Sequence, residues 1–272
     1  MGFEVNHVCT GVTHIRDAMG VCMTLIEGEK AALLVDTGYG VEDVGDFVLS
    51  LIGDKPVSVY LTHHHHDHTL GTYRLGSLSD CVISMLEADM PAFHIYNGQE
   101  KHRQVLAQAQ NRGLIGKDAL SEELFLACAC ELPSDAVPGN IDLGGLTVRI
   151  IDCPGHTPGS GCVLVTERKL LLTGDNWNPC TWLFFPEALD VRAYRENLRL
   201  LKAYDFTHVL CSHQLECFSR AKFEAFADGL TDAALDAANS VDIAGYEHID
   251  TRQADVAEGQ ILVFDWQKYR KD

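Results

Sequence analysis

The sequence lacks the features that mark membrane-spanning and disulfide-stabilised proteins. Its 272 residues contain no uninterrupted apolar run of the roughly 18 residues that a transmembrane helix needs. None of its ten cysteines forms a Cys-x-x-Cys pair, and the closest two, Cys128 and Cys130, have one residue between them. A chain of this length does not need disulfides to hold its core. We therefore expect most of the cysteines to be small buried hydrophobes in a reducing compartment.

Positive charge is also scarce. Lysine and arginine number 21 against 39 aspartates and glutamates, which gives a formal net charge of −18. A field of this sign repels phosphate backbones, so nucleic acid is not expected as a partner. Residues 1–7 lack the basic and then apolar layout of a signal peptide. We expect a cytoplasmic protein with no membrane partner that acts on a small molecule, and the sequence makes no prediction about its oligomeric state.

The hydrophobic content, 46%, is ample for a buried core, and we expect one domain over residues 1–272. Periodicity predicts that short strands alternate with helices in both halves of the chain, which indicates an α/β (α+β) protein. The predicted strands cover residues 21–27, 31–36, 57–61, 81–85, 143–151, 161–166, 169–173, 207–211 and 260–266. The predicted helices cover residues 41–52, 191–204 and 219–238, and another begins near residue 67.

Residues 87–130 form a long, polar and mainly helical stretch, which we interpret as an insertion into the domain. Its His94, Tyr96 and His102 could close over a site as a lid. The alternative is a peripheral pair of helices.

Residues 63–68, His-His-His-His-Asp-His, place five imidazoles and one carboxylate within six positions. The run is internal, is interrupted by Asp67 and follows a predicted strand, so it does not resemble a purification tag. Imidazole nitrogen and carboxylate oxygen are typical metal ligands, whereas a folded core has little use for five adjacent polar rings. The run therefore predicts a metal site at the carboxyl end of a strand.

Three further candidate ligands stand at strand-to-loop junctions downstream. His156 lies in a loop rich in proline and glycine at residues 152–160, Asp175 follows the apolar strand at 169–173, and His213 follows the strand at 207–211. Each one alone could be an ordinary polar loop residue. Together with residues 63–68 they form an ordered set of candidates.

This ordered set resembles the metallo-β-lactamase superfamily. The family pattern is His-x-His-x-Asp-His, a histidine in a Pro-Gly-His-Thr-x-Gly loop, an aspartate after a strand, and a final histidine. The resemblance implies that one metal is held by His63, His65 and His156 and a second by Asp67, His68 and His213, with Asp175 bridging them. It places His64 and His66 at the variable positions, as supporting or surface groups. Asp36, in an early Asp-Thr-Gly, would support the ligand loop by hydrogen bonding, because ligand histidines need an acceptor that fixes the ring; the alternative is a turn-capping role.

The fold that the resemblance implies is a four-layer αβ/βα sandwich, with two mixed β-sheets face to face and helices outside. The implied cofactors are two divalent ions, with zinc expected first and iron or manganese as the other choices. Such a pair lowers the pKa of a bridging water, so the implied enzyme is a binuclear hydrolase that uses a metal-bridging hydroxide. Asp67 would be the catalytic residue that orients this water or accepts its proton.

The expected substrate carries an ester-like bond. Aspartate at position 175 differs from the cysteine or serine expected in true β-lactamases, and the pattern is most similar to glyoxalase II, lactonases and small hydrolases. Trp177, Asn178, Trp182 and Phe184 closely follow Asp175 and are the candidate substrate-pocket residues. The aromatic members of this set could instead be plain core.

Two alternatives stay open. Related proteins use a single iron held by two histidines and one aspartate to oxidise persulfides, and such a set can be drawn from these residues. The second alternative is a non-catalytic metal-binding module, which would be expected to have lost ligands, and none is missing here.

Overall fold

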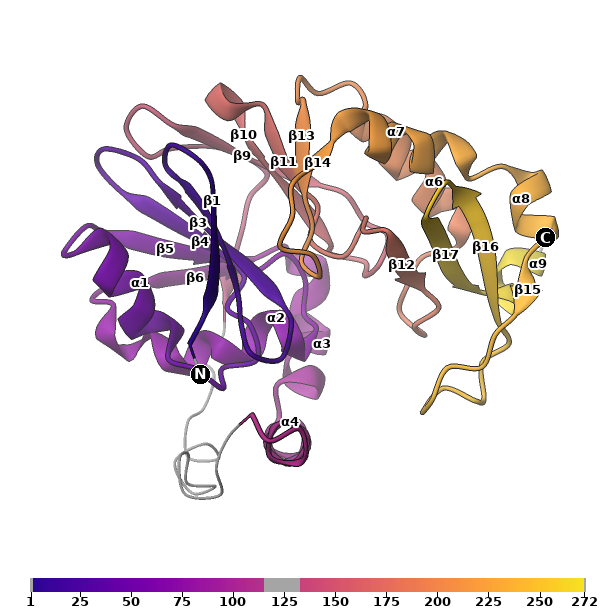
Figure 1. The fold of residues 1–272 in the computed structure, drawn as a ribbon, viewed down its shortest axis with the longest axis horizontal. Helices are drawn as coiled ribbons and strands as arrows, with labels where there is room; N and C mark the ends of the chain where they lie inside the picture. Colours follow the sequence, from indigo (N-terminus) through magenta and orange to yellow (C-terminus); the bar gives the residue numbers. More distant parts are fainter. Residues whose placement is uncertain (1, 115–132, 272) are drawn as a thin grey trace.

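The structure is a computed structural model that describes residues 2–114 and 133–271. In this part of the chain the strands form three sheets (Figure 1). The first sheet contains, in order, β1 (Glu4–Cys9), β2 (Val12–Arg16), β3 (Cys22–Glu27), β4 (Ala32–Val35), β5 (Val57–Tyr60), β6 (Val82–Met85) and β7 (Ser134–Asp135). The second contains β14 (Phe218–Ser219), β13 (His208–Leu210), β11 (Leu170–Leu172), β10 (Gly161–Val165), β9 (Thr147–Asp152) and β8 (Gly139–Asp142). The third contains β12 (Cys180–Leu183), β17 (Gln260–Asp265), β16 (Thr251–Ala257) and β15 (Asn239–Ser240).

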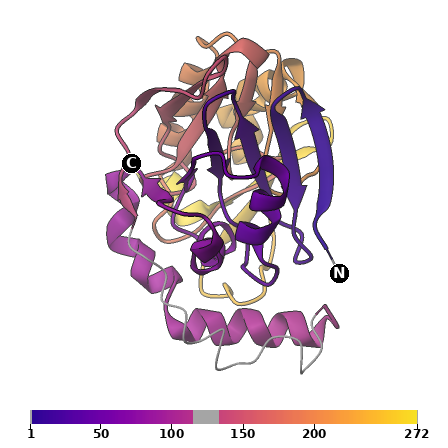
Figure 2. The ribbon, with the colours of Figure 1, turned by 90° about the vertical axis from the view of Figure 1, so that its left-hand side faces the viewer.

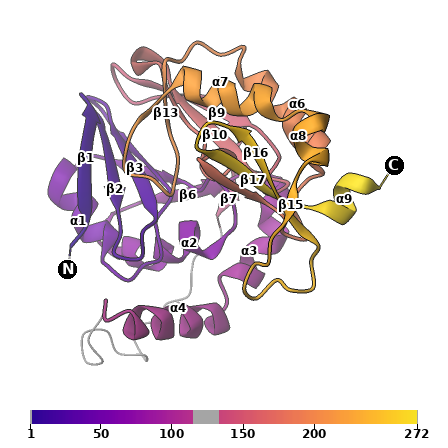
Figure 3. The same ribbon diagram turned by 45° about the vertical axis from the view of Figure 1, so that its right-hand side comes forward.

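Helices lie outside the paired sheets. The α-helices of the described residues are α1 (Val44–Ile52), α2 (His66–Thr69), α3 (Met90–Tyr96), α4 (Gln99–Asn111), α6 (Val191–Leu201), α7 (Arg220–Gly229), α8 (Asp232–Asp236) and α9 (Trp266–Arg270). Short 3-10 segments cover Leu70–Ser77, Glu87–Asp89 and Thr166–Arg168. Figure 1 shows α1 beside the first sheet, and α6 and α7 between the second sheet and the third. In Figures 2 and 3, α4 (magenta) lies along the lower edge of the molecule, and Figure 3 shows α3 above it.

The apolar runs of the sequence become strands that are buried on both faces. Successive side chains of a strand point to opposite sides, so Leu33 and Leu34 of β4 enter different cores. Leu33 packs between the two large sheets with Leu172 of β11, while Leu34 packs under α1 with Val48. Leu171 enters a third core, which the second sheet shares with α6, α7 and the third sheet. The result is the succession helix, sheet, sheet, helix.

The predicted α/β class and the layered fold are confirmed, and the structure adds the small third sheet. The predicted helix at 219–238 is wrong in its continuity, because it is split into α7 and α8. The split has a local cause: the Thr231 side chain accepts the Ala234 N–H and begins a new helix. Gly229 also packs so closely on β16 that an added Cβ would meet the Val256 carbonyl oxygen at 1.7 Å.

The hairpin β1–β2 was not predicted, because its outer strand β1 is edge-exposed and lacks a continuous apolar run. The insertion at 87–130 is described to residue 114 and contains the 3-10 segment Glu87–Asp89, α3 and α4; the part from 115 to 130 lies outside the described residues. The single-domain assignment stays a prediction. No helix of the described residues is long and apolar enough to cross a membrane.

Two leucines of α6 test how strongly the third core contributes to stability. Leu198 is fully buried, whereas Leu200 is 67% exposed on the same helix. We expect Leu198→Ala to lower the free energy of unfolding by about 2–5 kcal/mol through the lost contacts and the cavity. Leu200→Ala should change it by less than about 0.5 kcal/mol. Urea unfolding followed by circular dichroism measures both, and equal effects would contradict this account of the core.

Candidate metal centre

The histidine-rich loop leaves the first sheet at the carboxyl end of β5, where Asp36 holds it. Asp36 follows β4, the parallel neighbour of β5, and it is buried with a φ of 63°. Its Oδ1 accepts the Thr62 backbone N–H at 2.8 Å, and its Oδ2 accepts the Thr62 hydroxyl at 2.9 Å. The same Oδ2 lies 2.9 Å from Nδ1 of His68. The hydrogen bonds expected of Asp36 are therefore present, and they hold both ends of the loop.

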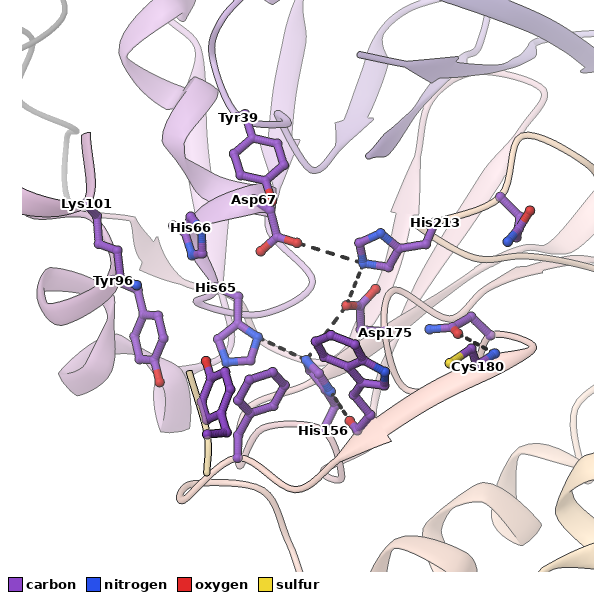
Figure 4. Close-up of a pocket in the computed structure, with 15 residues that line it drawn as sticks. Tyr39, His65, His66, Asp67, Tyr96, Lys101, His156, Asp175, Cys180 and His213 are labelled. Carbon is purple, nitrogen blue, oxygen red and sulfur yellow. Dashed lines mark hydrogen bonds and ion pairs between the residues drawn. The ribbon is translucent and has the colours of Figure 1, made fainter. Parts of the chain in front are cut away.

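A second loop carries His156, and Asn176 joins it to the loop of Asp175. Asn176 Oδ1 accepts the His156 backbone N–H at 3.0 Å, and its Nδ2 donates to the Cys153 carbonyl at 2.5 Å. The His156 ring is fixed separately, because its Nδ1 donates to the Trp182 carbonyl at 2.7 Å. These bonds bring His156 and Asp175 to the same cavity (Figure 4).

Three histidines form a first group of candidate ligands. The nearest ring nitrogens of His63, His65 and His156 lie within 4.8 Å of one another. His65 Nδ1 is 2.9 Å from His156 Nε2. The centroid of the His63 ring is 4.7 Å from that of His65 and 4.9 Å from that of His156. All three residues are buried, so the group is a compact ligand set made of nitrogen alone.

Asp67, His68, Asp175 and His213 form a second group, again with ligand atoms within 4.8 Å of one another. Asp175 Oδ2 is 2.9 Å from His213 Nε2 and 3.5 Å from His68 Nε2. Asp67 Oδ2 is 3.5 Å from His68 Nε2 and 3.8 Å from His213 Nε2. Asp175 Oδ2 also lies 3.8 Å from Nε2 of His156, which belongs to the first group. Asp175 thus stands between the two groups.

Several ligand atoms of the two groups lack hydrogen-bond partners, whose place metal ions could take. His63 Nε2, His68 Nε2 and Asp175 Oδ1 are buried without a hydrogen-bond partner among the described residues. A buried polar atom without a partner costs about 1–3 kcal/mol. Imidazole nitrogen and carboxylate oxygen suit zinc, iron and manganese, so two such ions would satisfy these atoms. All seven positions predicted from the sequence fall in the two groups, and their role as ligands stays a prediction.

The two groups differ in their electrostatics. Burial and the neighbouring imidazoles hold the pKa of His63 well below its usual value, and burial lowers the pKa of His156 to about 4. These rings are neutral, the form that binds metal. Burial also acts on His68, but the carboxylates of Asp67, Asp175 and Asp36 outweigh it and raise the pKa of His68. In the second group, a metal ion would replace the proton that the neighbouring carboxylates stabilise on His68.

The histidines at the two variable positions of the loop are both withdrawn from solvent. His64 is fully buried, with Nδ1 2.9 Å from Asp89 Oδ2. His66 is half-buried and lines the cavity, where its ring meets the ring of Tyr39 edge-on at 5.6 Å. Asp89 and Glu187, which contact this part of the site, were not identified from the sequence. No local pattern marks them, because their contacts arise only from the folded arrangement.

The two candidate ligand groups open into a pocket of about 430 Å³. Aromatic rings make up much of its wall, and Lys101 is the one lysine or arginine among the described residues that line it (Figure 4). The lining residues are Tyr39, His65, His66, Asp67, Tyr96, Lys101, His156, Asp175, Asn178, Cys180, Trp182, Phe185, His213, Gln214 and Tyr246. The volume is typical of a small-molecule site.

Of the four candidate pocket residues, the structure places Asn178 and Trp182 in the wall and excludes the other two. Trp177 is fully buried in the core of the second and third sheets, where its Nε1 donates to Gln260 Oε1 at 3.2 Å. Phe184 is also fully buried and packs behind the wall, against Trp182, at a ring distance of 5.2 Å. The two corrections have different causes. Trp177 lies in the bend between β11 and β12, where its ring enters the core, and Phe184 follows the last residue of β12 and packs on the side of Trp182 away from the pocket.

The insertion reaches the pocket through Tyr96 and Lys101. His94 is exposed and His102 is buried against Tyr73, and neither lines the pocket. A closing motion of this segment stays a prediction.

Comparisons with known proteins agree with this architecture. The model of the metallo-β-lactamase superfamily matches residues 17–101, which contain Asp36 and the histidine-rich loop. Among solved structures, a metallo-β-lactamase from Pontibacter korlensis is 17% identical with a TM-score of 0.56, covering 82% of this chain and 95% of that one. A stereoselective inverting sec-alkylsulfatase from Pseudomonas sp. is 16% identical with a TM-score of 0.63, covering 86% and 43%.

Residues 17–101 thus match the metallo-β-lactamase superfamily, and the likeness to solved structures of this fold extends over most of the chain. Identities as low as those of the solved structures show the fold alone.

Curated relatives carry more specific names. An atrochrysone carboxyl ACP thioesterase from Cryptosporiopsis sp. is 26% identical over 147 residues, which are 53% of this chain and 34% of the relative. A lactamase-like protein from Aspergillus fumigatus is 25% identical over 194 residues, 70% of this chain and 46% of the relative. The alignments thus span less than half the length of either relative.

Replacing Asp175 tests whether it joins the two groups. We expect Asp175→Ala to bind at least one metal ion fewer per chain than the unchanged protein, because both groups lose the carboxylate between them. Elemental analysis of the purified protein measures the metal, and far-UV circular dichroism checks the fold. Asp255→Ala, an exposed aspartate on β16, is the matched control. Full metal content in Asp175→Ala would contradict the bridging position.

Proposed function

We propose that the protein is a metal-dependent hydrolase that cleaves an ester-like bond in a small molecule, with a thioester as the first choice and a lactone as the second. The observation that carries the proposal is the position of Asp175. Its Oδ2 lies 2.9 Å from His213 Nε2 and 3.8 Å from His156 Nε2, and so reaches both groups. A shared carboxylate between two nearby ligand sets is the arrangement that suits two ions acting on one bond.

His63, His65 and His156 would hold one ion, and Asp67, His68 and His213 the other, with Asp175 shared. Two divalent ions held in this way would lower the pKa of a shared water and so would supply hydroxide near neutral pH. The protein's part is to fix the ligands. Each anchored imidazole uses one nitrogen for a hydrogen bond, as His68 does with Asp36 and His156 with the Trp182 carbonyl. The other nitrogen is left for the metal, and the ring cannot turn away.

Asp67 is the proposed proton acceptor. It lines the pocket and is 15% exposed, so its carboxylate can reach both a bound water and the substrate. The imidazoles of His68, His66 and His213 outweigh burial and lower its pKa, which keeps the carboxylate ionised. An ionised carboxylate can orient a water and accept its proton.

The pocket supports an acyl compound as the substrate class. Rings of Trp182, Phe185 and Tyr246 form a continuous aromatic wall, with centroids 6.3 Å apart between the first two and 5.5 Å apart between the last two. Lys101, on the far side near Tyr96, adds a positive charge that an anionic part of the substrate could contact. The name thioesterase, given to a curated relative, agrees with an acyl substrate.

The proposed activity is tested with purified protein and a panel of thioesters, lactones, phosphodiesters and β-lactams. We expect hydrolysis of a thioester or lactone that is lost on treatment with a chelator and restored by zinc. Elemental analysis should find two metal ions per chain. One iron per chain together with oxygen uptake on a persulfide would instead support the mononuclear dioxygenase, and metal binding without turnover on any of these substrates would support a non-catalytic module.

Asp67→Asn tests the proton acceptor. Because an amide is neutral and a poor base, we expect kcat to fall by about 10²–10⁴-fold, with a much smaller change in KM. Metal content must be measured in parallel, since a variant that has lost its metal says nothing about proton transfer. A metal-loaded Asp67→Asn with unchanged kcat would remove Asp67 from the mechanism.

Trp182→Ala tests the aromatic wall. The His156 ring bonds to the backbone carbonyl of Trp182, which the substitution retains. We expect KM for a thioester with an aromatic acyl group to rise about tenfold, the effect of losing roughly 1.4 kcal/mol of contact. KM for an acetyl thioester should change little, and an equal effect on both substrates would argue against a contact with the acyl group.

A further inference from the structure

We propose that Asp89, His64 and Glu187 form a buried clamp that positions the His63–His65–His156 group and so controls the affinity of one of the two metal sites. The inference rests on the binuclear centre of the proposed function. It gives a role to His64, which occupies a variable position of the loop and belongs to neither main ligand group.

Asp89 joins the two loops that carry the first group. It lies at the end of the 3-10 segment Glu87–Asp89 and is fully buried. Its Oδ2 accepts the His64 backbone N–H at 2.9 Å and the Thr157 hydroxyl at 2.7 Å. Its Oδ1 accepts the Gly159 backbone N–H at 2.6 Å. One carboxylate therefore sets the distance between the loop of His65 and the loop of His156.

The His64 ring is buried between two carboxylates. Its Nδ1 is 2.9 Å from Asp89 Oδ2, and its Nε2 is 3.6 Å from Glu187 Oε1. The ring also packs against His65 at 4.9 Å and against Tyr96 at 4.7 Å between centroids. Neither ring nitrogen has a hydrogen-bond partner among the described residues, so these are ion-pair distances, and they place the ring between Asp89 at the base of the insertion and Glu187 in the segment after β12.

Glu187 determines which nitrogen His65 presents. Its Oε1 accepts the Tyr96 hydroxyl at 2.6 Å and lies 2.9 Å from His65 Nε2. With Nε2 engaged, His65 turns Nδ1 towards His156 Nε2, at 2.9 Å. His63 and His156 have the opposite arrangement, because their Nδ1 atoms are engaged, by Thr62 and by the Trp182 carbonyl respectively. The loss of Glu187 would free His65 to rotate out of the group.

The clamp is specific to the first group. Its direct contacts with candidate ligands are to His65, whereas the second group is supported by Asp36 through His68. The nearest ligand atoms of His64, His65 and Glu187 themselves lie within 4.8 Å of one another, so a third ion is the competing interpretation. The clamp is favoured because a third ion bound through His65 Nε2 would require this imidazole to bridge two ions, one through each ring nitrogen.

Zinc titration of the metal-free protein against a chelating indicator tests the clamp without requiring activity. We expect two ions per chain in the unchanged protein. Glu187→Ala should weaken one of the two sites by about 10–100-fold, the usual cost of losing a supporting hydrogen bond, and leave the other unchanged. Glu187→Gln should restore part of the affinity, because its amide oxygen can still accept from His65. Glu247→Gln, a substitution of a solvent-exposed acid in another loop, is the matched control.

Cobalt supplies a second measurement. At one equivalent of cobalt, Glu187→Ala should show the visible spectrum of the second group alone, whereas Asp36→Asn should show that of the first. Unchanged affinities in Glu187→Ala, or equal weakening of both sites, would overturn the clamp, as would three zinc ions in the unchanged protein falling to two in the variant. Two ions with the predicted split, but no hydrolysis of any ester, would uphold the clamp and remove the proposed function.

Discussion

The crowding of imidazoles and carboxylates at one edge of two sheets is the constraint on which the rest of the site depends. His63, His68 and Asp175 each keep a buried donor or acceptor atom that no described residue satisfies. Such an arrangement is unstable by itself, so it persists only where the surrounding fold fixes the loops. Parallel pairing of β4 with β5, and of β11 with β13, delivers the loops of Asp36, His63, Asp175 and His213 to neighbouring positions. The layered arrangement of the sheets thus brings the candidate ligands together.

Different supporting carboxylates contact the ligands of the two candidate metal positions. Asp36 fixes the start of the histidine-rich loop and the ring of His68, while Asp89 and Glu187 act on His64 and His65. The division follows the chain: Asp36 comes from the first sheet, Asp89 from the base of the insertion, and Glu187 from the segment after β12. Each candidate metal position therefore depends on a different part of the fold, which allows one to change without the other.

The sequence predicted the seven candidate ligands because each stands in a short local pattern, at the end of an apolar strand or in a loop of proline and glycine. The alternation of strands and helices predicted the α/β class, whereas the layered fold was implied by the resemblance to the metallo-β-lactamase superfamily. Glu187 and Asp89 could not be predicted, because their partners lie far away in the chain and a lone acid carries no pattern. Trp177 was assigned to the pocket from its nearness to Asp175, but nearness in sequence does not decide whether a ring in a bend points into the pocket or into the core.

The same limit explains why the sequence predicted only a supporting or surface role for His64. A sequence motif does not specify the residue at a variable position, because that residue does not bind the metal. In this chain that position is fully buried between Asp89 and Glu187, and a ring with one nitrogen facing each carboxylate suits such a place better than an apolar side chain. The identity of residue 64 is therefore coupled to acids outside the motif. Of the four consecutive histidines, His63 and His65 are candidate ligands, His66 lines the pocket, and His64 supports the loop from its buried position.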